Sequence, residues 1–99
     1  IAAEKKDLSS EISDRAARAP YYLILDGQGN LVEAVKNPFK IGGGGAGFAV
    51  AKMLGDRKIE AFVAGRIGSN MRGALEERGI RAYELAGTAG EAPSRLEET

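Results

Sequence analysis

Five glycines stand in the six positions from Gly42 to Gly47, and this run limits the folds that the chain can adopt. Each glycine costs roughly 0.5 to 1 kcal/mol of folding free energy relative to Ala, so the run indicates a backbone that turns sharply or approaches a ligand. The next residues, 48–54, have helical spacing up to Gly55. We therefore predict a glycine-rich loop that opens a helix and offers unpaired N–H groups to an anion.

The segments around this loop have the order of a three-layer α/β sandwich. The expected elements are strands at 1–3, 21–25 and 31–35, a helix ending at 55, a strand at 61–64, a helix from 71 to 78 capped by Ser69 or Asn70, a strand at 80–85 and a terminal helix from about residue 88. This order, β-β-β-α-β-α-β-α, predicts a mixed five-stranded sheet with helices on both faces. Residues 1–99 are expected to form a single domain.

Three loops are predicted to meet at the carboxyl edge of this sheet, where open α/β folds bind ligands. They are the loops at residues 5–19, 36–47 and 65–72, and together they contain eight cations and three anions, or +5. Lys+Arg and Asp+Glu are equal over the whole chain, at 14 each, so the remainder has a charge of −5. A neutral chain is therefore expected to have one positive edge.

The composition excludes several classes of function. The chain has no Cys and no His, which removes disulfides, thiolate nucleophiles, zinc sites and protein-ligated iron-sulfur clusters. Its zero net charge argues against nucleic acid or an anionic membrane as a partner. With no signal peptide or membrane span in the sequence, a cytoplasmic monomer is expected. Because Ile1 is not an initiator residue, we expect the natural chain to extend further at its N-terminus.

Common catalytic patterns are also missing. Phe48 and Ala49 stand where a phosphate-binding loop needs Lys and then Ser or Thr. The element order is also that of ribonuclease H-like nucleases, but no second carboxylate is expected to meet Glu4 at the carboxyl edge. We therefore expect no enzymatic activity.

Short blocks in a particular order connect the chain with a known family. The blocks are Arg18-Ala19-Pro20-Tyr21-Tyr22, Asn37-Pro38, Gly44-Gly45-Ala46-Gly47, Gly65-Arg66-Ile67-Gly68 and a helix ending in Gly79-Ile80. With them the chain resembles the dinitrogenase iron-molybdenum cofactor-binding (NifX/NafY-like) family over nearly its whole length, and within it the orange proteins of anaerobic bacteria. The resemblance implies a ribonuclease H-like fold without nuclease activity. It also implies non-enzymatic binding or carriage of a molybdenum-containing metal-sulfur cluster, of the molybdenum-copper sulfide or iron-molybdenum type.

Two departures from the family pattern shape this expectation. Some cofactor carriers of the family use a His or Cys to hold the cluster, and this chain has neither, so we expect non-covalent binding without protein metal ligands. Residues 15–18, Arg-Ala-Ala-Arg, also replace the more usual Arg-Phe-Gly.

The candidate site combines loop cations, loop glycines and polar groups at the predicted edge. The residues expected to bind the cofactor are Arg15, Arg18, Tyr21, Lys40, Gly43, Gly44, Gly45, Gly47, Arg66, Gly68, Asn70 and Arg72. Of the two neighbouring tyrosines, one is expected in the core and the other at the ligand. Met71 is expected to be a packing residue, with a thioether contact to copper as the alternative.

Other functions remain open from the sequence. A cofactor-delivery protein is a candidate partner of a cluster carrier. A metal-free regulatory or adaptor domain would use the same edge for a protein partner. An enzyme acting on a small phosphorylated or carboxylated compound is the third hypothesis.

Overall fold

The computed structural model describes residues 1–39 and 45–97. Its elements are β1 (Ala2–Ala3), β2 (Tyr21–Leu25), β3 (Leu31–Lys36), α1 (Ala46–Gly55), β4 (Ala61–Ala64), α2 (Ser69–Glu77), β5 (Arg81–Glu84), the 3₁₀ helix η1 (Ala89–Glu91) and α3 (Ala92–Glu97). The predicted order is confirmed. Gly79 follows α2 with φ +72°, the left-handed conformation that ends many helices.

The strands form two sheets and not the single five-stranded sheet predicted from the sequence. Antiparallel β1, β2 and β3 make one sheet, and parallel β4 and β5 make the other. β1 contains two residues and lies beside β4. Ser13 bridges the two sheets, because its N–H donates to the Ala2 carbonyl (2.8 Å) and its carbonyl accepts the Gly65 N–H (2.7 Å). This bridge takes up a backbone group that a β1–β4 ladder would need, and the ribonuclease H-like sheet is not confirmed.

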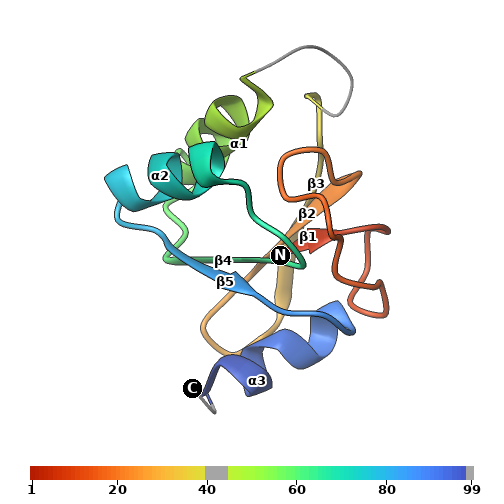
Figure 1. Cartoon of the computed structure of the whole chain (residues 1–99). Helices are drawn as coiled ribbons and strands as arrows, with labels where there is room; N and C mark the ends of the chain where they lie inside the picture. Colours follow the sequence, from red (N-terminus) through yellow and green to blue (C-terminus); the bar gives the residue numbers. More distant parts are fainter. Residues whose placement is uncertain (40–44, 98–99) are drawn as a thin grey trace.

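Helices nevertheless lie on both sides of the strands, as predicted. In Figure 1, α1 and α2 lie together above the strands and α3 lies below them. Neighbouring residues of one strand face opposite layers: in β4, Phe62 packs with the α1–α2 core, whereas Val63 packs with Ala92 of α3. The alternation of side chains along a strand thus builds two apolar layers, one under each group of helices.

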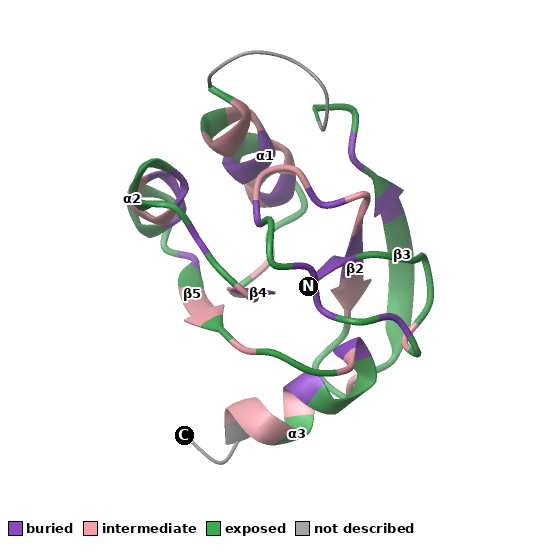
Figure 2. Cartoon of the chain, turned by 45° about the vertical axis from the view of Figure 1, so that its right-hand side comes forward, coloured by how far each residue is buried: buried purple, intermediate pink, exposed green. Residues whose placement is uncertain are grey.

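β3 is the outer strand of its sheet, and its burial pattern shows this position. Val35 is 8% exposed and lies opposite Tyr22, whereas Val32 is 66% exposed. Figure 2 shows exposed residues along most of β3.

None of the helices in the described ranges has the length and apolar character needed to cross a membrane.

The register of β3 gives a testable difference between two valines. We expect Val35→Thr to lower the free energy of unfolding by about 1–3 kcal/mol, because it buries a hydroxyl group in an apolar layer. The control, Val32→Thr, should change it by less than about 0.5 kcal/mol, as is usual at exposed positions. Urea unfolding followed by circular dichroism measures both. Equal losses would contradict the register.

Candidate functional site

The first and third loops meet at the carboxyl end of β4. The Ala16 N–H donates to the Arg66 carbonyl (3.3 Å), next to the bond between Gly65 and Ser13. Gly65 is required here, since a Cβ at this position would lie 2.9 Å from the Cα of Asp14 and 2.3 Å from its Oδ1. The predicted approach of these two loops is confirmed for the described residues.

The buried side chain of Asn37 fixes the first loop to the end of β3. It is 2% exposed, and its Nδ2 lies 3.1 Å from the Ala17 carbonyl oxygen and 2.9 Å from that of Ala19. Its Oδ1 accepts the Phe39 N–H (2.8 Å). One amide group thus joins the backbone of the first loop to the backbone that follows β3.

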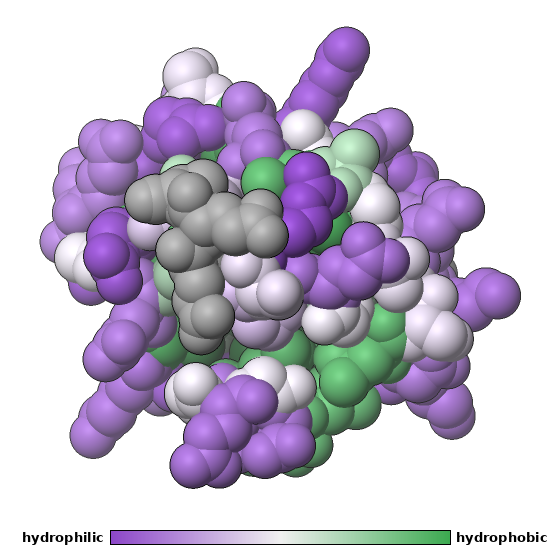
Figure 3. All heavy atoms as spheres, turned by 90° about the horizontal axis from the view of Figure 1, so that it is seen from below, coloured by the Kyte–Doolittle hydropathy of each residue, from purple (hydrophilic) through white to green (hydrophobic). Residues whose placement is uncertain are grey.

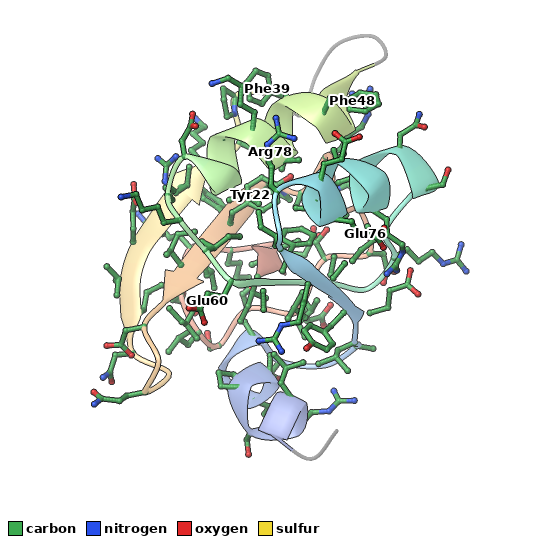
Figure 4. All side chains as sticks on the ribbon, turned by 90° about the vertical axis from the view of Figure 1, so that its left-hand side faces the viewer. Tyr22, Phe39, Phe48, Glu60, Glu76 and Arg78 are labelled. Carbon is green, nitrogen blue, oxygen red and sulfur yellow. The ribbon has the colours of Figure 1, made fainter. Side chains whose placement is uncertain are left out.

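Tyr22 completes this network from the core below. Its hydroxyl accepts a hydrogen bond from Asn37 Nδ2 (3.2 Å) and donates to the Ala16 carbonyl. Burial raises the pKa of the Tyr22 phenol, so the group keeps its proton and remains a donor. Of the two tyrosines, Tyr22 is therefore the core residue, and Figure 4 shows it under α1 and α2.

The N-termini of α1 and α2 lie side by side. A Cβ on Gly47, in the first turn of α1, would lie 3.0 Å from the Cβ of Met71 in the first turn of α2. The N-cap residues are Gly45 and Gly68, neither helix has a side-chain cap, and neither has an acidic residue in its first turn. The prediction that Ser69 or Asn70 caps α2 is therefore wrong, because the helix begins at Ser69.

A helix N-terminus without a cap is a positively polarised end with free N–H groups. The first N–H groups of a helix have no intrahelical partner, and the helix dipole makes this end positive. Two such ends in contact favour an anion at their shared opening.

The predicted site residues differ in how far they are exposed and in which segment they lie. Arg66, Gly68 and Asn70 are exposed between β4 and the start of α2, and Arg18 and Tyr21 are half-buried at the end of the first loop and the start of β2. Lys40, Gly43 and Gly44 lie outside the described residues.

Two of the predicted cations face carboxylates. Arg15 Nη2 lies 3.8 Å from Glu4 Oε1 in an exposed pair. Arg72 Nη2 lies 3.5 Å from Oε2 of Glu84 at the end of β5, and the same oxygen accepts the Ile67 N–H (2.9 Å). The positive charge of these two side chains is thus partly compensated.

Lys5 and Lys6 lie in a part of the first loop that is held away from the third loop, although the predicted charge of +5 included them. The Ser10 hydroxyl accepts the N–H groups of Glu4 and Lys5 and holds this part of the loop in a turn. The turn is fixed to η1, because the Gly90 N–H donates to the Leu8 carbonyl (2.9 Å). Leu8 also packs beside Ala89, so an apolar contact between segments distant in sequence turns this part of the loop toward the opposite layer.

In the described part of the chain, no group of three or more His, Cys, Asp or Glu side chains could hold a metal ion. Met71 is 2% exposed and packs in the core with Leu75. Packing is therefore its role in this structure, as expected.

A large cavity lies away from the three loops. It has a volume of about 470 Å³ and is lined by the end of β2, the start of β4 and residues of α3, including Leu25, Phe62 and Leu96. Seen from the α3 side, the surface shows apolar areas among hydrophilic side chains (Figure 3). This cavity does not lie at the predicted binding edge.

Sequence reasoning missed the binding-edge roles of Asn37 and Glu84. Asn37 precedes a proline at the end of a strand, and Glu84 ends the last strand. Both lie at carboxyl strand ends, where binding groups gather in open α/β sheets, but their partners are distant in sequence, so the sequence indicates their position and not their contacts.

The architecture is that of a small mixed α/β domain in which two helix N-termini lie in contact. The chain belongs to the dinitrogenase iron-molybdenum cofactor family, whose model matches residues 1–99, and the family predicted from the sequence is confirmed.

Two solved structures are similar to the chain over 99% of its length. The NMR structure of a Thermotoga protein described as a candidate NifB protein is 35% identical with a TM-score of 0.83, and 84% of that protein is covered. The apo form of the orange protein from Desulfovibrio gigas is 26% identical with a TM-score of 0.92, again with 84% of that protein covered. No curated protein sequence matches the chain significantly.

The Asn37 network can be tested by stability. We expect Asn37→Ala to lower the free energy of unfolding by about 1–3 kcal/mol, because it leaves buried backbone and phenol groups without partners. The control, Asn70→Ala, removes an exposed amide and should change stability by less than about 0.5 kcal/mol. Thermal and urea unfolding measure both, and an undiminished stability of Asn37→Ala would contradict the anchoring role.

Proposed function

We propose that the chain binds and carries an anionic molybdenum-containing metal-sulfur cluster, of the molybdenum-copper sulfide or iron-molybdenum type, without catalysing a reaction. Family membership and the likeness to the orange protein support this class of cargo. The proposed binding is non-covalent, and the proposed carrier is a cytoplasmic monomer that exchanges its cargo with a cofactor-delivery protein.

The observation that carries the proposal is the pair of uncapped helix N-termini. Gly45 and Gly68 leave the first N–H groups of α1 and α2 without side-chain acceptors, and the Gly47–Met71 contact brings these ends together. Sulfur and oxygen atoms of a thiometallate accept hydrogen bonds from such groups, and the helix dipoles stabilise its negative charge.

Cations and half-buried groups around this opening would complete the site. The proposed binding residues are Arg15, Arg18, Tyr21, Lys40, Gly43, Gly44, Gly45, Gly47, Arg66, Gly68, Asn70 and Arg72. Because the chain contains no Cys or His, the cluster would be held by charge and hydrogen bonds, and its binding should weaken as added salt screens the charges.

A metal-free adaptor domain is the second candidate, and two exposed aromatic side chains favour it. Phe39 is 36% exposed just before the glycine-rich segment, and Phe48 is 53% exposed in the first turn of α1 (Figure 4). Aromatic side chains on a surface are frequent anchors of protein partners. Co-purification of a stable partner that Phe48→Ala releases would favour this function.

The carrier function predicts a coloured complex. Anaerobic incubation of the apo-protein with tetrathiomolybdate and Cu(I), followed by gel filtration at low salt, should give a visible absorption band that elutes with the protein and contains molybdenum and copper. Absence of colour and metal in the protein fraction would contradict the molybdenum-copper form of the proposal, and the same assay with iron and molybdenum tests the other form.

Matched charge reversals test where the cluster binds. We expect Arg66→Glu to weaken binding about tenfold or more, since it places an anion beside the helix N-termini. Arg81→Glu makes the same charge change at an exposed position at the start of β5, and should weaken binding less than about threefold. Equal effects would indicate a general charge effect instead of a site.

A further inference from the structure

Glu84 already makes the contacts that a bound anion would make at the third loop. Its Oε2 accepts the Ile67 N–H at 2.9 Å and lies 3.5 Å from Arg72 Nη2. One carboxylate oxygen therefore engages a backbone N–H of the Gly65–Gly68 loop and a guanidinium of the first half of α2.

The position of this contact links it to the proposed site. Ile67 lies between β4 and α2, Arg72 lies in α2, and Glu84 is the last residue of β5, so all three are at the carboxyl edge. Glu84 faces the α2 side of its strand, because Tyr83 before it packs in the layer beside α3.

Another anion can displace the Glu84 carboxylate from Arg72 and the Ile67 N–H. The side chains of Arg72 and Glu84 are 36% and 47% exposed, and exposed ion pairs contribute little to stability. A polyanion with several acceptor atoms can therefore replace this carboxylate at modest cost, provided that its own interactions with Arg72 and the loop N–H are stronger.

We propose that Glu84 is an affinity-determining residue, an internal anion that competes with the cargo for Arg72 and the Ile67 N–H. The inference rests on the proposed carrier function, and it assigns a residue that opposes binding. Arg72 then belongs to the site only when Glu84 gives it up. Such a competitor lowers the affinity for weak or adventitious anions and keeps binding reversible.

A structural role for Glu84 predicts different behaviour. If the carboxylate only held the loop in shape, Glu84→Gln would keep an acceptor for the Ile67 N–H and would leave anion affinity unchanged or lower. Competition predicts tighter binding instead, because the charge that occupies Arg72 is gone.

The experiment titrates tetrathiomolybdate alone, without copper, into the full chain and its variants and measures dissociation constants by equilibrium dialysis. Glu84→Gln should bind about two- to fivefold more tightly than the unmodified protein. Glu60→Gln is the matched control: it makes the same charge change just before β4, at the opposite end of this strand from Ile67, and Glu60 forms no ion pair with another described residue (Figure 4). It should bind within about 1.5-fold of the unmodified protein.

A double-mutant cycle identifies the partner of Glu84. In an Arg72→Gln background, Glu84→Gln should lose most of its effect, because the cation for which it competes is absent. Circular dichroism melting curves of each variant verify that it is folded.

The possible outcomes distinguish the proposed competition by Glu84 from the proposed carrier function. If the unmodified protein binds and Glu84→Gln binds equally or more weakly, the competition is overturned and the carrier function stands. If Glu84→Gln binds and the unmodified protein does not, competition is supported. If neither binds, the competition is overturned, and the carrier function is decided by the assays with copper or iron.

Discussion

The buried amide of Asn37 is the interaction on which the binding edge depends. It holds the carbonyls of Ala17 and Ala19, the hydroxyl of Tyr22 and the backbone of Phe39 in one network. A buried polar group is stable only when its partners are in place, so the first loop, the end of β3 and the core strand β2 adopt their positions together. The edge is consequently a preorganised part of the fold, although loops form it.

Both the backbone and the side chains contribute positive charge at this edge. The N-termini of α1 and α2 meet without caps or acidic residues in their first turns. By contrast, Arg15 and Arg72 have carboxylate neighbours in Glu4 and Glu84. Backbone N–H groups cannot be neutralised by a change of rotamer, whereas paired arginines become available only when their partners move. A chain of zero net charge thus has an edge with two positive helix N-termini and two arginines paired with carboxylates.

Much of the fold could be predicted because it follows from local pattern. The apolar runs of β2 and β4 gave strands with the expected bounds. Gly79 marked the end of α2, although this helix begins at Ser69 and not at residue 71 as expected. For the candidate site, the approach of the first and third loops could be predicted, whereas the contacts between individual side chains could not. Asn37 and Glu84 escaped prediction because a buried amide and an internal anion are defined by partners distant in sequence. Lys5 and Lys6 were misplaced for the same reason, since the contact of Leu8 with η1 turns their segment away.

The sequence by itself determined the order of the elements, the glycine-rich entry to α1 and the absence of any Cys or His ligand. These depend on residue type and short-range periodicity. Only the tertiary structure decided that Ser13 bridges two sheets, that two helix ends touch through Gly47 and Met71, and that Glu84 occupies Arg72. The physical reason is that these features are contacts between distant segments. Their free energy depends on atoms placed within a few ångströms by the whole fold, and no local pattern encodes that placement.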